Sequence, residues 1–178
     1  MEVIRDMRDF LSRLQEMGEI RTLEGVDLNL EVGALTELMG EREDKALLFD
    51  RFKDYPPGFR IMSNVFRTCK RSALVLGISQ DLKGVEFLNA WRKKLLGFEP
   101  MPVEQVEGGP VFENQMGEDD VDLYKFPTPI WHDLDGGLYI GTGCGVITKD
   151  PESGKVNIGT YRVMIQEKNK VSVKFNKG

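Results

Sequence analysis

The chain has 178 residues, of which 40% are hydrophobic and 30% charged, and its formal net charge at pH 7 is −5. These proportions are typical of a folded protein with a core of its own, whereas an acidic chain suits nucleic-acid phosphates poorly, so we expect no nucleic-acid partner. No apolar run reaches the roughly 18 residues of a membrane span, and the two cysteines, Cys69 and Cys144, form no disulfide framework. We therefore expect a cytoplasmic protein without a membrane span.

The first hundred residues alternate between helical and strand patterns. Apolar residues recur at helical spacing over 6–17, 28–39, 70–76 and 82–96, and short apolar runs predict strands over 19–23, 46–49 and 60–66. We expect Asn29 to cap the second helix and Gly40 to end it. In the last helix Val85, Leu88, Trp91 and Leu95 form one apolar face. This alternation predicts an α/β domain over residues 1–115.

Prolines and glycines interrupt the pattern between Gly97 and Asp120, which indicates a crossover to a mostly β domain over residues 116–178. The core of that domain is predicted to be two strands within residues 135–166, joined by a polar turn. Gly141, Gly143 and Gly145 would share one strand face and leave it bare, as happens where a ligand or another backbone comes close.

Two polar residues of the second predicted strand are candidate site residues. Asn157 offers an oxygen that suits hard cations, and Arg162 offers a permanent cation shaped for carboxylate or phosphate. Because they lie five positions apart, a regular strand would place them on opposite faces. A bulge at 158–160, centred on Gly159, would bring both to one cleft. The alternative is an ordinary strand with one polar residue on each solvent edge.

Two other residues are expected to be structural. His132 is the chain's single histidine and lies between Trp131 and Asp133, where a structural role is commoner than a ligand role. Cys144 would face away from the three glycines as a buried thiol.

Four segments together resemble the UbiD-type decarboxylases, which use prenylated FMN: NIGTYR, DGGLYIGTG, FPTPIWHDLDGG and LLFDRFKDYPPGFRIMSNVF. The resemblance runs over almost the whole chain. It implies an α+β fold, with the N-terminal α/β domain followed by the start of a split β-barrel of the flavin-reductase kind. It also implies the N-terminal part of a reversible non-oxidative decarboxylase of aromatic or α,β-unsaturated carboxylic acids.

The resemblance also assigns site residues. Asn157 matches a ligand of a divalent metal, for which Mn²⁺ is the first candidate, with K⁺ as a further ion. Arg162 matches the catalytic arginine beside the substrate carboxylate. The residues that match cofactor contacts are Thr160, Tyr161, Arg162, Lys174, Phe175 and Asn176.

The family pattern continues into a histidine and acidic residues that this chain does not contain. We therefore expect either a portion of a longer enzyme or one subunit of a split one, completed by a second subunit or by further copies in a homo-oligomer. The alternative is a non-catalytic partner or assembly subunit of a split UbiD-type enzyme. A plain FMN-binding barrel is a third option, but it leaves the first hundred residues without a role.

Overall fold

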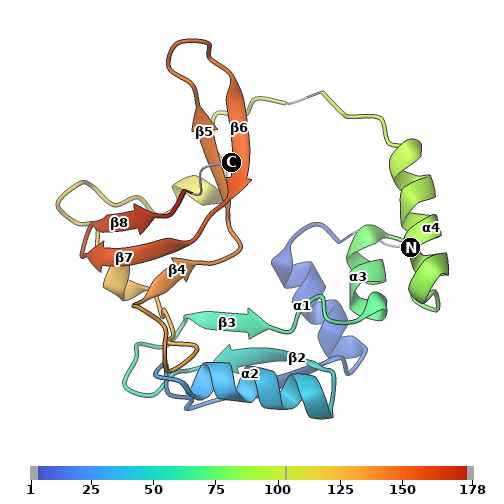
Figure 1. Cartoon of the computed structure of the whole chain (residues 1–178), viewed down its shortest axis with the longest axis horizontal. Helices are drawn as coiled ribbons and strands as arrows, with labels where there is room; N and C mark the ends of the chain where they lie inside the picture. The colour runs from blue at the N-terminus through green and yellow to red at the C-terminus, as the bar shows by residue number, and fades with distance from the viewer. Residues whose placement is uncertain (1–3, 103, 176–178) are drawn as a thin grey trace.

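The computed structural model describes residues 4–102 and 104–175. The first half is a three-stranded sheet covered by helices, and the second half contains two small antiparallel sheets (Figure 1). The elements of the first half are α1 (Met7–Glu16), β1 (Ile20–Leu23), α2 (Glu31–Arg42), β2 (Ala46–Asp50), β3 (Arg60–Ser63), α3 (Cys69–Leu76) and α4 (Gly84–Leu96). Among the described residues, no helix is both long enough and apolar enough to cross a membrane.

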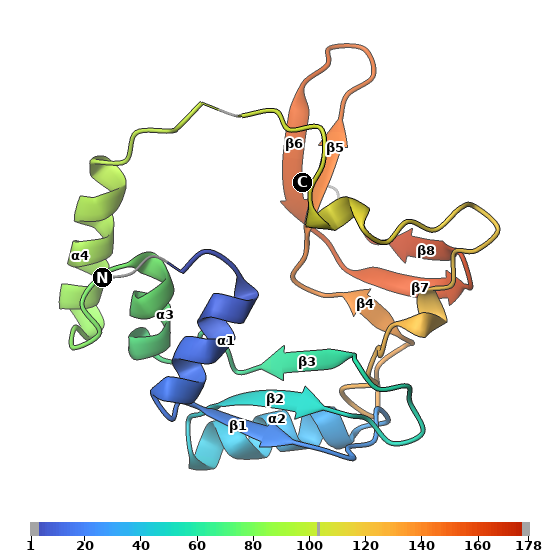
Figure 2. The same ribbon diagram turned by 180° about the vertical axis from the view of Figure 1, so that it is seen from behind.

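Strand β2 is the centre of the first sheet, pairing parallel with β1 and antiparallel with β3. Leu47 and Phe49 belong to the core cluster beneath α2, whereas Ala46 belongs to the cluster beneath α1. Alternate residues of a strand face opposite sides, so the two helices cover the two faces of the sheet (Figure 2). Double coverage explains why β2 reads as an unbroken apolar run, and the predicted buried strand is confirmed.

The predicted ends of α2 were wrong at both termini. The N-cap is Leu30, with φ of 70°, because Asn29 forms a β-bridge with Ile130 of the second half and is held there in strand pairing. Gly40 does not end the helix but lies buried within it, where a Cβ would meet the Arg67 guanidinium at 3.0 Å. Pairing with a distant segment, which local capping rules do not contain, therefore acts at the N-terminal end, and a packing contact accounts for the glycine inside the helix.

Helix α4 stands beside α3 and contributes nothing to the core. Most of its predicted apolar face is exposed, with Val85, Leu88 and Leu95 at 71%, 60% and 51% of full exposure, whereas Trp91 is half-buried. Lys94 donates from Nζ to the carbonyl oxygens of Leu76 and Gly77 at the end of α3, at 2.6 and 3.3 Å. The amphipathic pattern therefore predicts this helix correctly, but within the described residues most of its apolar side has no cover.

A buried arginine joins three segments of the first half. Arg71 of α3 is fully buried, and its Nε and Nη2 donate to the carbonyl oxygens of Val65 and Asn64, each at 3.1 Å. Its Nη1 donates to the Glu19 carboxylate at 3.1 Å and to the Asp44 carbonyl. Burial alone would raise the pKa of Glu19, but hydrogen bonds and charge from Lys70 and Arg71 outweigh it and lower that pKa.

In the second half, each of the two strands predicted within residues 135–166 is divided into two shorter strands. Its elements are η1 (Pro110–Phe112), η2 (Leu123–Lys125), β4 (Tyr139–Gly141), β5 (Gly145–Lys149), β6 (Val156–Thr160), β7 (Val163–Glu167) and β8 (Lys170–Val173). One sheet has the order β4-β7-β8, and β5 and β6 form a separate ribbon that projects from it (Figure 1). No closed barrel forms from the described residues, so the split barrel stays a prediction, as does the domain boundary at residue 115.

The glycine strip is consequently interrupted. Gly141 ends β4, Gly145 begins β5, and Gly143 lies in the irregular step between them. Cys144 was expected on the opposite face, but its thiol folds back over Gly141, where an added Cβ would lie 2.6 Å from Sγ. Gly141 therefore makes room for this thiol, which donates to the Tyr161 carbonyl at 3.6 Å across the break.

The two halves meet at α2, where Gly33 faces the backbone of Trp131. We expect Gly33→Ala to destabilise the chain by about 1–3 kcal/mol, because the new methyl group would overlap the Trp131 carbonyl oxygen. At an unobstructed helical site the same change would stabilise by up to about 1 kcal/mol. Urea unfolding followed by circular dichroism measures the difference. Gly136→Ala is the control, since its Cβ would meet nothing closer than 3.8 Å; a stabilising Gly33→Ala would contradict the contact.

Candidate functional site

A polar cavity of about 540 Å³ lies where the ribbon leaves the β4-β7-β8 sheet. It is lined by Thr142 from the break between β4 and β5, by Thr160, Tyr161 and Arg162 from the break between β6 and β7, and by Lys174 after β8. The Lys174 backbone N–H donates to the Arg162 carbonyl at 3.3 Å, which holds the two basic residues side by side. Four of the seven residues predicted for the site therefore line one space.

The cavity carries two cations. Neither Arg162 nor Lys174 forms a salt bridge within residues 4–102 and 104–175. Because unpaired guanidinium and ammonium groups favour carboxylate or phosphate, the cavity suits an anionic group. This positive site lies in a chain whose net charge is −5, so the basic character is local.

The predicted bulge at 158–160 was wrong in position. Strands β5 and β6 pair without interruption from Gly145 opposite Thr160 to Lys149 opposite Val156. The regular strand ends only after Thr160. Gly159 has a different role: the ring of Tyr161 lies against it and would overlap any Cβ there. That ring also packs on Phe175, with centroids 4.7 Å apart and planes at 56°.

Asn157 is not among the residues that line this cavity. It lies on β6 opposite Thr148, exposed, and three positions before Thr160, so the two point to opposite faces of the ribbon. In the described part of the chain, no three His, Cys, Asp or Glu side chains are grouped closely enough to hold a metal ion. Asn176, predicted to contact the cofactor, lies outside the described residues.

His132 contacts the other half of the chain. Its Nε2 lies 2.8 Å from Glu37 Oε1 on α2, and the Asp135 carboxylate accepts from the backbone N–H groups of Trp131 and His132, each at 3.1 Å. These contacts fit the structural role expected from its neighbours.

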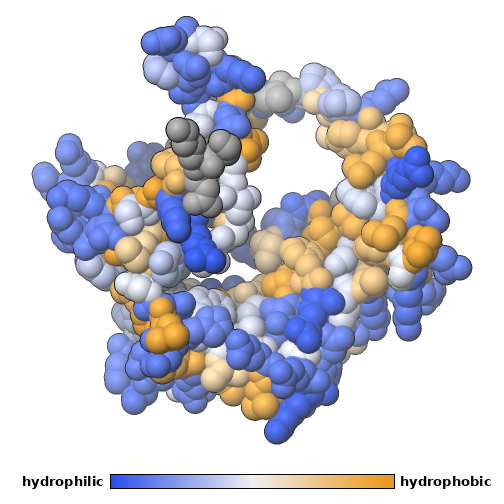
Figure 3. All heavy atoms as spheres, in the orientation of Figure 1, coloured by the Kyte–Doolittle hydropathy of each residue, from blue (hydrophilic) through white to orange (hydrophobic). Residues whose placement is uncertain are grey.

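Thr142 is a lining residue that the sequence reasoning missed. It also lines a second, larger cavity of about 1020 Å³, which reaches across to α1 and β3 and includes Phe66 and Trp131. In Figure 3 an opening runs through the middle of the molecule, with apolar residues along part of its edge. The sequence did contain a signal for Thr142: it lies between Gly141 and Gly143, which have no side chains to cover it.

Comparison with known proteins identifies two consecutive matches. Residues 11–91 match the 3-octaprenyl-4-hydroxybenzoate carboxy-lyase N-terminal domain (UbiD_N), and residues 101–178 match the Rift-related domain of the same carboxy-lyase (UbiD). The pyrrole-2-carboxylic acid decarboxylase of Pseudomonas aeruginosa is 31% identical over 172 residues, which cover 92% of this chain and 34% of that protein. The phenolic acid decarboxylase of Bacillus subtilis is 32% identical, with 95% of this chain and 37% of that protein covered.

Solved structures show the same fold. The vanillic acid decarboxylase ShVdcCD of Sedimentibacter hydroxybenzoicus superposes with a TM-score of 0.81 at 25% identity, over 97% of this chain and 37% of that one. HmfF of Pelotomaculum thermopropionicum, a UbiD-class enzyme in complex with prFMN, gives 0.76 at 25% identity, over 95% and 38%. The chain spans about a third of the length of these relatives. With both domain models matched in order and the fold shared, this chain belongs to the UbiD family and corresponds to its N-terminal portion.

Proposed function

We propose that this chain supplies the prenylated-FMN-binding part of a reversible, non-oxidative decarboxylase of aromatic or α,β-unsaturated carboxylic acids. The observation that carries the proposal is the cavity lined by Thr160, Tyr161, Arg162 and Lys174, the same residues that the family resemblance assigns to the cofactor. Its relatives include decarboxylases of pyrrole-2-carboxylic and phenolic acids, and the UbiD-class structure named above holds prFMN.

The lining residues fit the cofactor chemically. A volume of about 540 Å³ is in the range of small-molecule sites. Arg162 and Lys174 suit a phosphate group, and the half-buried ring of Tyr161 suits contact with a flat ring system. When bound, the prenylated flavin supplies the electron sink for loss of carbon dioxide, while the protein supplies orientation and charge.

Arg162 is the residue that we propose to hold the substrate carboxylate. A guanidinium can donate two parallel hydrogen bonds to a carboxylate and keeps its charge at any working pH. The adjoining cavity of about 1020 Å³ shares Thr142 with the site and has Phe66 and Trp131 in its wall. It offers space for the apolar body of the acid next to the charged anchor.

A metal does not fit the described residues by themselves. Asn157 would supply one neutral oxygen, and Mn²⁺, Mg²⁺ or K⁺ needs several further oxygen ligands, including carboxylates for the divalent ions. We therefore propose that any metal takes its remaining ligands from the C-terminal part of a longer enzyme, from a second subunit or from another copy of the chain. Two unpaired cysteines, Cys69 and Cys144, fit a cytoplasmic setting.

A non-catalytic assembly subunit is the second candidate. Two observations favour it. The related vanillic acid decarboxylase ShVdcCD has a separately named component, ShVdcD, and apolar residues of α4 are exposed among the described residues. An assembly subunit would stabilise a partner without holding flavin itself.

Flavin binding and carbon dioxide release together test the proposal. The purified chain is mixed with prenylated FMN, first alone and then with any polypeptide that copurifies with it, and assayed against a panel of aromatic and unsaturated acids. Retained flavin with carbon dioxide release supports the enzyme. Enhanced activity of a partner that holds all the flavin supports the assembly subunit. Absence of both flavin retention and partner activation contradicts both functions.

A further inference from the structure

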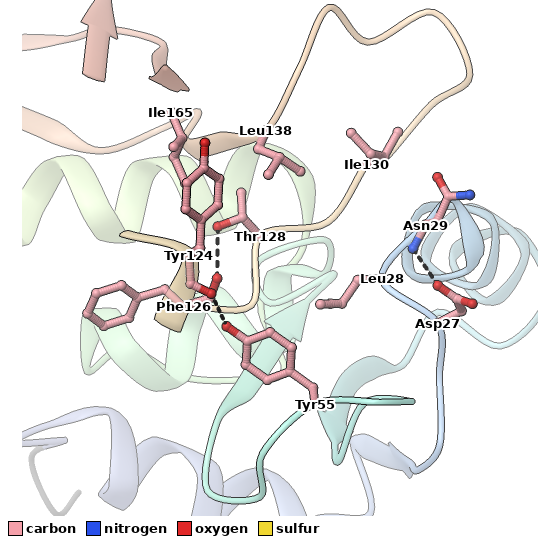
Figure 4. Close-up of a pocket in the computed structure, with 10 residues that line it drawn as sticks. All are labelled: Asp27, Leu28, Asn29, Tyr55, Tyr124, Phe126, Thr128, Ile130, Leu138 and Ile165. Carbon is pink, nitrogen blue, oxygen red and sulfur yellow. Dashed lines mark hydrogen bonds between the residues drawn. The ribbon is translucent and has the colours of Figure 1, made fainter. Parts of the chain in front are cut away.

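A third cavity lies at the joint between the two halves, and it shares no lining residue with the two described above. Its volume is about 280 Å³, and its walls come from the segment before α2, the loop after β2, the η2 region and the sheet that contains β7. Figure 4 shows the lining side chains of all of these segments, with Leu28, Ile130 and Leu138 between the aromatic residues on one side and the Asp27–Asn29 pair on the other.

Hydrogen bonds behind the walls hold this joint cavity open. The Leu30 N–H donates to the Ile130 carbonyl at 2.9 Å, and the Ile130 N–H donates to the Leu28 carbonyl at 3.0 Å. On the other side the Tyr55 hydroxyl donates to the Tyr124 carbonyl at 2.7 Å. These backbone groups already have partners, so the cavity is formed before any ligand enters and offers mainly apolar surface.

The walls are suited to a flat apolar molecule. Leu28, Ile130, Leu138 and Ile165 line it with aliphatic carbon, and the rings of Tyr55, Tyr124 and Phe126 line it with aromatic carbon. Figure 4 shows the Tyr124 ring beside Ile165 and the aromatic group on one side of Leu28. Aromatic side chains favour offset or edge contacts with a further ring.

The other side of Leu28 is polar. The Asp27 carboxylate accepts from the Asn29 backbone N–H at 2.8 Å, and this hydrogen bond is the main reason that the pKa of Asp27 is lowered. The carboxylate is therefore charged at neutral pH, and Lys53 Nζ lies 3.5 Å from its other oxygen. A charged carboxylate can only accept hydrogen bonds, so it favours a donor and repels an anion.

We propose that the joint cavity binds a small neutral aromatic molecule with one hydrogen-bond donor, of the phenol type, with its ring among the apolar walls and its hydroxyl group at Asp27. A largely apolar cavity with a few polar groups at one end is the usual form of a small-molecule site. The lining residues come from both halves, so the bound molecule strengthens the joint. This inference does not depend on the flavin site.

Phenol and benzoate are the probes, titrated into the flavin-free chain and followed by ¹H–¹⁵N NMR. We expect phenol to shift the amide signals of Leu28, Ile130 and Ile165 with a Kd of about 0.1–1 mM, in line with the limited affinity available to so few atoms. Benzoate, matched in ring but negatively charged, is expected to bind at least about tenfold more weakly. An absence of saturable shifts at these amides, or equal binding of benzoate, overturns the proposal.

Two substitutions test the position and the charge separately. Leu138→Trp fills the cavity and abolishes the phenol shifts, whereas Ile147→Trp, which adds the same ring at an exposed position of β5 outside the cavity, preserves them. Asp27→Asn removes the charge and raises benzoate affinity about five- to tenfold, with phenol binding little changed. Unchanged phenol binding in a folded Leu138→Trp chain overturns the proposed position. If that variant does not fold, unchanged benzoate binding in Asp27→Asn overturns the proposal by itself.

Discussion

Replacing Arg71 with methionine is expected to lower the free energy of unfolding by about 3–5 kcal/mol. Methionine can fill much of the space of the arginine stem but donates no hydrogen bonds. The carbonyl oxygens of Asn64 and Val65 would therefore lose the donors that Arg71 now provides, and the Glu19 carboxylate would keep Lys70 but lose its buried partner. Urea unfolding of the purified chain, followed by far-ultraviolet circular dichroism, measures the loss.

Lys70→Met is the matched control, because Lys70 binds the same carboxylate at 2.6 Å. Its side chain is 46% exposed, so water replaces the lost partner and the expected cost is below about 1 kcal/mol. Similar losses in the two variants would show that burial of Arg71 contributes little. A loss below about 1 kcal/mol in Arg71→Met would contradict the role of Arg71 in holding three segments of the first half together.

Replacing Arg162 with lysine in the flavin-loaded, active assembly is expected to lower the decarboxylation rate by about 10²–10³. Lysine keeps the positive charge but lacks the planar pair of N–H groups that fits a carboxylate. This test rests on the proposed function, and it measures initial rates of carbon dioxide release at saturating substrate.

Arg92→Lys is the control for this change, since Arg92 is exposed on α4 and lines none of the cavities described above. Its activity should equal that of the unmodified protein. Retained flavin must be measured in both variants, because a variant that loses the cofactor reports on binding rather than on catalysis. Full activity in flavin-loaded Arg162→Lys would mean that another residue anchors the substrate.

The residues of the family motif lie together in the structure because they are contiguous in the chain, whereas their role in cofactor binding stays a prediction. Thr160, Tyr161 and Arg162 follow one another, so any local backbone shape leaves them near one another, and the structure places all three around one cavity. The prediction that Asn157 and Arg162 share one cleft did not rest on adjacent residues. It depended on where the strand breaks, and the break lies after Thr160 rather than at Gly159. Strand parity could show that a break was needed for both residues to share a site, but not where it would be.

Glycines were the least predictable residues. Gly40 was expected to stop a helix, yet it is buried inside α2 against Arg67. No role was predicted for Gly33, yet it lies against the backbone of Trp131, which is almost a hundred residues further along the chain. A missing side chain signals close approach, but the identity of the approaching segment is not a local property of the chain.

The sequence by itself determined the helices and strands of the first half, the apolar centre at Ala46–Phe49 and the grouping of the three candidate residues that end at Arg162, because spacing and adjacency act over a few residues. Tertiary structure alone decided that Leu30 rather than Asn29 caps α2 and that Thr142 lines the cavity beside Arg162. It also decided that Arg71 is buried and that a cavity forms at the joint. Each of these depends on segments distant in sequence, whose packing is settled only when the whole chain folds.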